Sequence, residues 1–271
     1  MTSSQTWSTV AISALAAVIA WGFWRNLGDT QPEVVEMDLD GAIGTDVLAD
    51  QWVPVIRDHC MHEGAMVVRI TSPGGSPGEA ARIASALRAC HRTVYTVAEG
   101  VAASAALLPL TAGNEVILDP YALVGGMGIV KPMTSWASFA QTVGVADQSI
   151  ASGPLKLAGS PLRTLSEAER ASIERLVSAA SAQFRSDIAG QRPKLNLAPE
   201  TEQGALITAG AAREQGIGDR VGTIDALQRE LPGTWQNVTP TRPQGPQQIL
   251  TLAAGAITRG IAAEISTSPI E

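Results

Sequence analysis

Histidine is scarce in this sequence. Three occur among 271 residues, and none lies in a context typical of a catalytic base. His59 and His62 lie three residues apart and could share one helix face, but no glutamate or cysteine arrangement completes a known metal site around them. His91 follows the expected end of a helix, near Arg88 and Arg92. We therefore expect neither a histidine base, nor a bound metal, nor a cofactor.

Runs of lysine or arginine are also missing, and the formal net charge is −7 at pH 7. Binding to nucleic acid requires a basic patch that meets the phosphates. We therefore do not expect a nucleic-acid partner.

Cysteine is nearly absent, with Cys60 and Cys90 as the two examples. We interpret them as two ordinary thiols. The alternative is a disulfide, which would require an oxidising compartment.

Charge is absent from residues 7–24, a stretch rich in alanine and isoleucine with Trp7 and Trp24 at its ends. Eighteen helical residues rise about 27 Å, close to the thickness of a bilayer hydrocarbon core. Tryptophan suits both membrane interfaces. We interpret the stretch as one uncleaved transmembrane helix. A cleaved signal peptide, for which residues 1–6 lack a basic residue, and a buried helix are the alternatives.

Short β-branched runs alternate with helical patterns along the rest of the chain, which predicts an α/β fold. Strands are expected at residues 34–40, 65–70, 93–98 and 115–118. Helices are expected at 48–58, from 77 with Ser76 as the cap, at 102–111 and 135–142, as a pair near 202–215, and at 223–231. The longest helix should begin at a capping box formed by Thr164 and Glu167 or by Ser166 and Glu169. Its predicted apolar stripe consists of Ile173, Leu176, Val177, Ala180, Phe184 and Ile188.

Three segments follow from this pattern. Residues 1–28 form the membrane anchor and its flanks, residues 29–231 the α/β domain, and residues 232–271 a proline-rich linker with a helical tail. The tail regains a helical pattern at residues 249–265, which suits core packing, oligomer contacts or a membrane surface.

Ser104 and Lys156 are the residues with the clearest chemical potential. A serine hydroxyl becomes a nucleophile when a neighbouring base removes its proton, and an apolar environment can make lysine neutral enough for that role. Ser104 lies in an apolar stretch, at the expected start of a helix whose free N–H groups, with the turn at Gly75, could hold an oxyanion. Taken alone, each feature has an ordinary structural explanation: Ser104 as a packing residue, Lys156 as a solvated surface charge, and the glycine sequence as a turn. Their order and separation of fifty-two positions support the dyad.

Four motifs give the chain a family resemblance over residues 34–231. They are RITSPGGS at residues 69–76, AAS at 102–104, SGPLKLAGSPLR at 152–163 and AGAAREQGIGD at 209–219. The chain resembles the signal peptide peptidase A group of the S49 serine peptidases, and more distantly the Clp protease and crotonase fold. The resemblance implies a spiral of short β-sheets and helices behind the N-terminal transmembrane helix.

The resemblance also implies roles for individual residues. Ser104 would be the nucleophile, Lys156 the general base, and the backbone N–H groups of Gly75 and Ala105 the oxyanion hole. The enzyme would be a serine endopeptidase that cleaves signal-peptide remnants or unfolded apolar polypeptides through an acyl-enzyme. It would form a homo-oligomeric ring in which adjacent subunits supply serine and lysine. It would be a single-pass protein of the cytoplasmic membrane, with the catalytic domain on the outer side.

Two departures from the family pattern keep other functions open. The family has Gly-Gly after the nucleophile where this chain has Ala105 and Ala106. Its Thr-Gly-Ser loop, whose serine orients the lysine, aligns with residues 124–126, Val-Gly-Gly, and Ser152, Ser160 or a water would have to substitute. One alternative is a catalytically weak or inactive scaffold or peptide-binding ring. Another is crotonase-like acyl-CoA chemistry, which would not call for a serine–lysine pair.

Overall fold

The computed structural model describes residues 33–242 of the chain. The expected membrane anchor, residues 1–28, and the tail helix at residues 249–265 lie outside this range. Within residues 33–242, no helix has both the length and the apolar character needed to cross a membrane.

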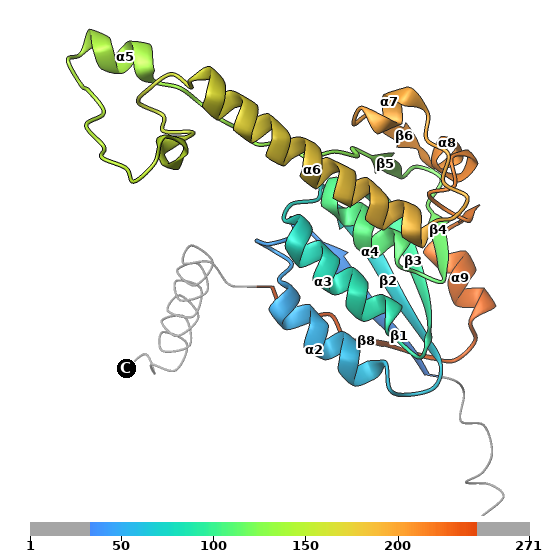
Figure 1. The fold of residues 1–271 in the computed structure, drawn as a ribbon. Coiled ribbons are helices and arrows are strands. Elements are labelled where there is room, and N and C mark those ends of the chain that lie inside the picture. The colour runs from blue at the N-terminus through green and yellow to red at the C-terminus, as the bar shows by residue number, and fades with distance from the viewer. Residues whose placement is uncertain (1–32, 243–271) are drawn as a thin grey trace, which may run out of the picture.

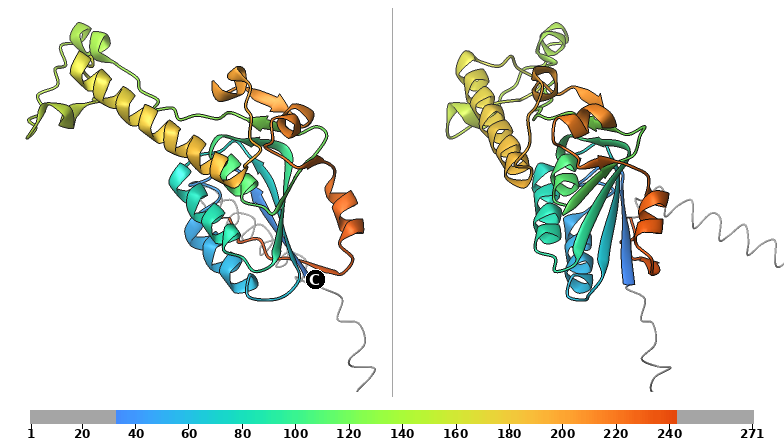
Figure 2. Two further views of the ribbon diagram at one scale, coloured as in Figure 1. Left: turned by 45° about the vertical axis from the view of Figure 1, so that its right-hand side comes forward. Right: turned by 90° about the vertical axis from the view of Figure 1, so that its right-hand side faces the viewer.

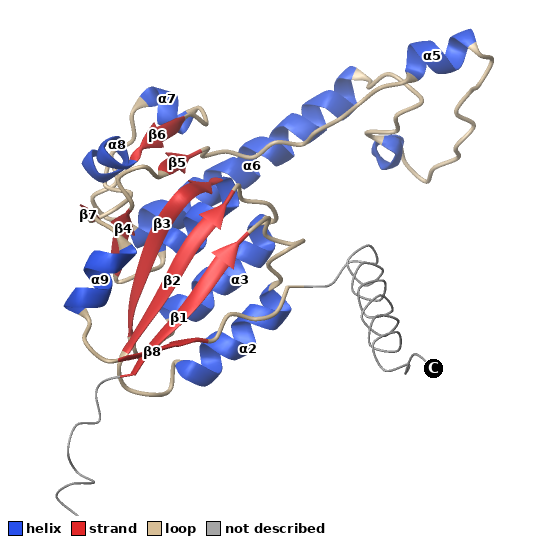
Figure 3. Ribbon diagram, turned by 180° about the vertical axis from the view of Figure 1, so that it is seen from behind, coloured by secondary structure: helices blue, strands red, loops and turns tan. Residues whose placement is uncertain are grey.

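A mostly parallel sheet of eight strands forms the centre of the fold (Figures 1 and 3). Its main path runs β6-β5-β3-β2-β1-β8, with β4 pairing with β3 and β7, and the β5–β6 pair alone is antiparallel. The strands are β1 (Glu33–Asp40), β2 (Ala65–Ser72), β3 (Thr93–Ala103), β4 (Glu115–Leu118), β5 (Leu123–Gly125), β6 (Leu206–Thr208), β7 (Arg220–Val221) and β8 (Thr234–Asn237). β2 begins with four consecutive buried residues, as expected for a parallel strand covered on both faces. The predicted α/β class is confirmed.

Helices cover the two faces of the sheet unequally (Figure 2). α2 (Ala49–His59), α3 (Pro77–Arg88) and α4 (Leu107–Thr111) lie on one face, where they pack with the sheet in the larger cluster of buried apolar residues. α9 (Ile224–Glu230) lies on the other face, where Leu227 packs in a smaller cluster with Val34 and Val67. Ser76 caps α3 as predicted, because its side chain accepts a hydrogen bond from the Glu79 amide.

Cys60 and Cys90 form a disulfide, so the two-thiol interpretation was wrong. Cys60 is the C-cap residue of α2, and Cys90 lies two residues beyond the end of α3. The two helices pack side by side, which brings the Cα atoms to 4.8 Å. The two cysteines are 30 residues apart, and nothing in the sequence between them indicated that the two helices pack together.

Residues 130–180 project from the sheet as an extension that we call the arm (Figures 1 and 2). It contains α5 (Ala137–Thr142), η2 (Pro154–Leu157) and the first half of α6 (Glu167–Gln191). The Ser166–Glu169 capping box is formed as predicted. The apolar stripe of α6 is buried at Phe184 and Ile188, but Leu176 in the arm is 68% exposed. The predicted stripe therefore enters the core only in the second half of the helix.

Three boundaries differ from the sequence prediction around the site and at the far edge of the sheet. β3 continues to Ala103, so the helix expected from residue 102 begins later, as η1 (Ser104–Ala106) followed by α4. β6 separates two short helices, α7 (Pro199–Glu202) and α8 (Ala209–Glu214). Residues expected to begin the linker form β8, which pairs with β1.

Candidate active site

Ser104 lies where β3 ends and η1 begins. Its φ of 53° is the one positive φ of a non-glycine residue in the part of the chain that the structure describes. An L-residue in this region costs of order 1–2 kcal/mol, and such strain persists where the surroundings impose it. Here Ala102 pairs with Ser72 of β2, and Ala103 pairs with Gly125 of β5. The two neighbouring strands therefore fix the chain immediately before the serine and force a sharp change of direction at Ser104.

The glycine turn after β2 lies directly against this serine. A Cβ on Gly74 would lie 2.7 Å from the Ser104 Cβ and 2.9 Å from the Ala105 nitrogen. Gly74 has a φ of 98°, which favours glycine. The turn is held by Ile43, whose N–H donates to the Gly74 carbonyl at 2.8 Å and whose carbonyl accepts from Ser76 N–H at 2.8 Å. The strand ends thus bring the two predicted motifs into contact.

Two backbone amides beside Ser104 are available to a ligand. The Gly75 N–H donates to no group within residues 33–242, because the bridge with Ile43 uses the atoms on either side of it. Ala105 is the second residue of η1, and the first amides of a helix have no intrahelical acceptor. Such amides suit an oxyanion hole, the role predicted for these two residues.

Gly126 is the third element next to Ser104. A Cβ at this position would lie 3.4 Å from the Ser104 nitrogen and 3.5 Å from the Ala103 Cβ. The loop that lacks the family's serine is therefore adjacent to the candidate nucleophile. Its φ of 63° lies in the left-handed region, which glycine adopts without strain.

Lys156 lies on the arm, in η2, with an exposed side chain. Its segment packs against the first half of α6, where Leu155 lines the same groove as Ile173. α4, which follows Ser104, packs against the second half of α6, and the Thr111 hydroxyl of α4 is hydrogen-bonded to Gln191. At ~1.5 Å per residue, Ile173 and Phe184 are separated by about 16 Å along this helix. A single chain therefore brings Ser104, Gly75 and Ala105 together but leaves Lys156 apart from them.

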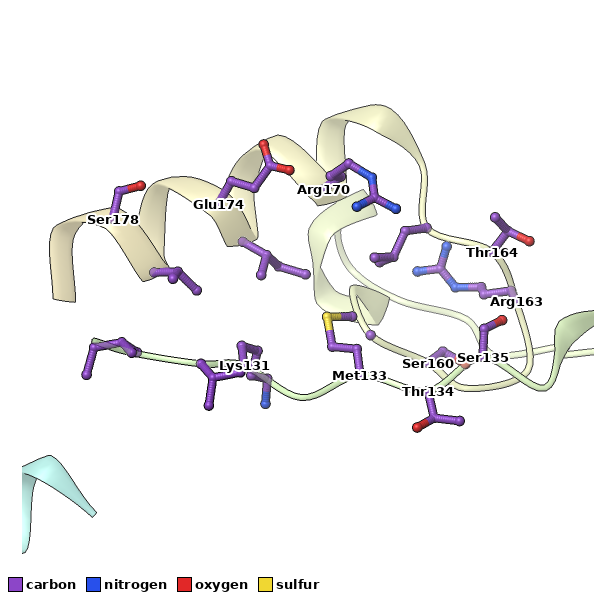
Figure 4. A pocket seen from close by; sticks show the side chains of 16 residues that line it. Lys131, Met133, Thr134, Ser135, Ser160, Arg163, Thr164, Arg170, Glu174 and Ser178 are labelled. Atoms are coloured by element: carbon purple, nitrogen blue, oxygen red, sulfur yellow. The ribbon is translucent and has the colours of Figure 1, made fainter. Parts of the chain in front are cut away.

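A groove of about 630 Å³ runs along the arm between residues 129–135, the loop before α6, and α6 itself (Figure 4). Apolar side chains such as Met133, Ile173 and Val177 line it, and its charged members are Lys131, Arg163, Arg170 and Glu174. Sequence reasoning missed this groove, because its walls come from segments separated by loops without a clear period.

A polar cluster closes the loop that carries Lys156. Asp147 accepts hydrogen bonds from the Ser149 amide at 2.9 Å and the Ser160 hydroxyl at 2.8 Å. Arg163 lies 4.0 Å from the Asp147 carboxylate and donates to Glu169 of α6 at 3.2 Å. Hydrogen bonds from Ser149, with a further one from Ser160, lower the pKa of Asp147 to about 2.

Glu169 is the buried end of this cluster, with 2% of its surface exposed. It accepts from the Ser166 amide at 2.8 Å as part of the capping box. The Arg163 guanidinium, followed by the Ser166 amide, lowers the pKa of Glu169 to about 2. Both carboxylates are therefore ionised at neutral pH.

The histidines take no part in this site. His59 Nδ1 lies 3.0 Å from the Val55 carbonyl in its own helix. Within residues 33–242, no group of three or more histidine, cysteine, aspartate or glutamate side chains could hold a metal ion.

Comparison with known proteins identifies the family. The model of peptidase family S49 matches residues 86–237, more than half of the chain. The chain belongs to peptidase family S49. The matched range contains Ser104 and Lys156, whereas the Gly74–Gly75 turn precedes it.

Two relatives that are named as peptidases support this assignment. The putative signal peptide peptidase SppA of Enterococcus faecium is 25% identical over 173 residues, covering 61% of this chain and 50% of that protein. The putative protease slr0021 of Synechocystis is 25% identical over 224 residues, covering 81% of this chain and 80% of that protein. A protein of Brucella abortus named Na(+)/H(+) antiporter NhaA is 26% identical over 188 residues, covering 68% of this chain. This S49 chain matches 26% of the Brucella protein and half of the Enterococcus protein.

Proposed function

We propose that the chain is a serine endopeptidase in which Ser104 attacks the carbonyl carbon of a peptide bond. The Ser104 proton passes to a lysine amine, and the Gly75 and Ala105 amides stabilise the resulting oxyanion. The lysine then protonates the leaving amine, and water hydrolyses the acyl-enzyme. The observation that carries this proposal is the strained Ser104 (φ 53°) packed against the Gly74–Gly75 turn within an S49 chain.

We assign the base to Lys156 of a neighbouring subunit. A lysine acts as a base at neutral pH when an apolar environment disfavours its charged form. The exposed Lys156 of a single chain lacks that environment, and it lies away from Ser104. An adjacent arm that reaches Ser104 would supply both the amine and the apolar surroundings. Exposed apolar residues on the arm, among them Trp136, Phe139 and Leu176, favour such an assembly.

The expected substrates are signal-peptide remnants or unfolded apolar polypeptides. Support comes from the name of the Enterococcus relative, a putative signal peptide peptidase, and from the apolar membrane-anchor pattern at residues 7–24. We place the domain on the outer side of the cytoplasmic membrane, with one N-terminal span. The Cys60–Cys90 disulfide is compatible with that oxidising side. We propose the Clp/crotonase-type spiral of short β-sheets and helices as the fold of the domain.

A second candidate function is a weak or inactive scaffold that binds peptides. Two observations favour it: position 126 offers no hydroxyl beside Ser104, and Lys156 is not at the serine within one chain.

Cleavage of an unfolded apolar protein by the full-length chain in detergent tests the proposal. The comparison includes Ser104→Ala, Lys156→Ala and the control Lys194→Ala, which alters an exposed lysine outside the arm. Loss of cleavage in the first two variants with activity kept in the control supports the proposal. A correctly assembled but inactive wild type would favour the scaffold, and cleavage that survives both substitutions would exclude the dyad.

A further inference from the structure

The polar cluster at the base of the Lys156 loop is unusual in its burial. Glu169 is 2% exposed, and the Asp147 side chain is 9% exposed. Burial of a carboxylate is costly unless it is paired and hydrogen-bonded. Here Arg163 lies between the two carboxylates, and three serines contribute hydrogen bonds. The cluster therefore fixes the positions of its members relative to one another.

The cluster ties both ends of one loop to the start of α6. Asp147 stands at the beginning of the loop, Ser160 and Arg163 at its end, and Glu169 in the first turn of the helix. Between them, Lys156 N–H donates to the Gly153 carbonyl at 3.1 Å, in a short turn four residues before Ser160. The Lys156 backbone is thus held in a closed loop.

The other half of α6 reaches the core beside Ser104. Phe184 and Ile188 are buried there, and α6 contacts α4, the helix that follows η1. α6 is one continuous helix of 25 residues, so it fixes the position of the cluster at its start relative to the core at its end. The loop is therefore anchored to α6 through Glu169, Arg163 and Asp147, in addition to the contacts that η2 makes with the same helix.

We propose that Asp147, Arg163 and Glu169 are positioning residues that hold Lys156 at the angle and height at which it meets the serine of a neighbouring subunit. This inference rests on the proposed function, because it assumes that Lys156 acts as the base. Catalytic groups must be held close to their productive geometry, and a misplacement of ~1 Å can lower the rate about 100-fold. None of the three residues need touch the substrate.

The low pKa values of the two carboxylates support this role. Asp147 and Glu169 have pKa values of about 2, so they stay ionised across the range in which an enzyme with a lysine base works. The cluster therefore holds the loop without titrating in that range.

The test uses the full-length chain and two pairs of variants. Asp147→Ala is compared with Glu230→Gln, which removes a partner of an exposed ion pair with Arg220 far from the arm. Ser160→Ala is compared with Ser160→Thr, which keeps the hydroxyl that Asp147 accepts. Each variant is assayed for kcat and KM, for the pH dependence of kcat, for oligomer mass, and for hydrogen exchange at residues 153–160.

We expect Asp147→Ala to lower kcat about 10- to 100-fold with KM within about twofold, since binding is retained while the base is misplaced. The acid limb of the kcat–pH profile of this variant should move to higher pH. Hydrogen exchange at residues 153–160 should become at least about tenfold faster than in wild type. Ser160→Ala should show the same pattern more weakly, while Ser160→Thr and Glu230→Gln match wild type.

Three results would overturn the inference. The first is faster exchange in the loop with kcat unchanged, and the second is a loss of kcat with loop exchange unchanged. The third is a loss of activity explained wholly by a smaller oligomer mass. Failure of the proposed function has a different signature: wild type itself would be inactive, or Lys156→Ala would remain active.

Discussion

Gly74 lies so close to Ser104 that a Cβ on Gly74 would be 2.7 Å from the Cβ of Ser104. The contact joins the end of β2 to the end of β3, two neighbouring parallel strands. It brings the Gly75 amide and the Ala105 amide to the same edge of the sheet as the candidate nucleophile. The active-site proposal depends on this arrangement, and each element of it can be altered separately.

Gly74→Ala should abolish most of the activity. The new methyl group would meet the Ser104 Cβ and the Ala103 carbonyl at 2.7 Å, and a φ of 98° is unfavourable for alanine. Displacing an oxyanion donor lowers kcat by about 100-fold or more. The matched control is Gly78→Ala in α3, where a Cβ meets nothing within 4 Å. Cleavage rates and denaturant unfolding of both variants check the prediction. A folded Gly74→Ala variant with full activity would show that the turn is not part of the site.

Gly126→Ser should raise activity, because it places a hydroxyl beside the Ser104 amide at the position where the family has one. The left-handed φ of 63° will lower stability by about 1 kcal/mol relative to glycine. Gly126→Ala carries the same backbone penalty without the hydroxyl and serves as the control. A rate for Gly126→Ser that is equal to or below that of Gly126→Ala would remove the missing hydroxyl as an explanation for weak activity.

Breaking the Cys60–Cys90 disulfide should destabilise the domain. The bond closes a loop with a sequence separation of 30 residues, and chain entropy alone predicts a loss of about 3–4 kcal/mol. Urea unfolding of the double variant Cys60→Ser, Cys90→Ser against wild type measures the difference. Added reductant should lower wild-type stability and leave the double variant unchanged. Equal stability of the two proteins without reductant would mean that the bond contributes nothing.

The pairing of Glu169 with Arg163 should make stability depend on pH in the acid range. The pKa of Glu169 is lowered from 4.5 to about 2 in the folded chain. Its contribution is therefore fully present above the unfolded pKa of 4.5 and is lost as the pH falls toward 2.

The melting temperature of wild type should exceed that of Glu169→Gln by a constant margin above pH 6, and the margin should shrink as the pH falls below about 4.5. Glu174→Gln, an exposed residue in the next turn of α6, is the control and should track wild type. A margin that does not change between pH 6 and pH 2.5 would contradict the ionised pairing.

Local signals in the sequence predicted much of the fold. The Ser76 cap, the Ser166–Glu169 capping box and the first four strands are encoded within a few residues, and all are confirmed. The approach of Gly74 to Ser104 could be anticipated only through the family resemblance, because it depends on the neighbouring positions of β2 and β3 in the sheet.

Features set by long-range packing were missed. The disulfide depends on how α2 lies beside α3, and β8 depends on a pairing with β1 about 200 residues away in sequence. The first half of the α6 stripe has the same apolar period as the buried second half. Periodicity therefore could not distinguish residues on the arm from residues that pack in the core. The positive φ of Ser104 arises because β3 continues to Ala103, whereas its apolar neighbours also suit a helix.

The measurement that tests the central claim most directly mixes two inactive chains. Full-length Ser104→Ala and Lys156→Ala are co-expressed in equal amounts and purified as mixed oligomers in detergent. If adjacent subunits supply serine and lysine, about a quarter of the sites regain both groups by random assembly, and cleavage returns to about that fraction of wild type. Each variant alone stays inactive. Mixed oligomers that remain inactive, beside an active wild type, would contradict a site shared between subunits.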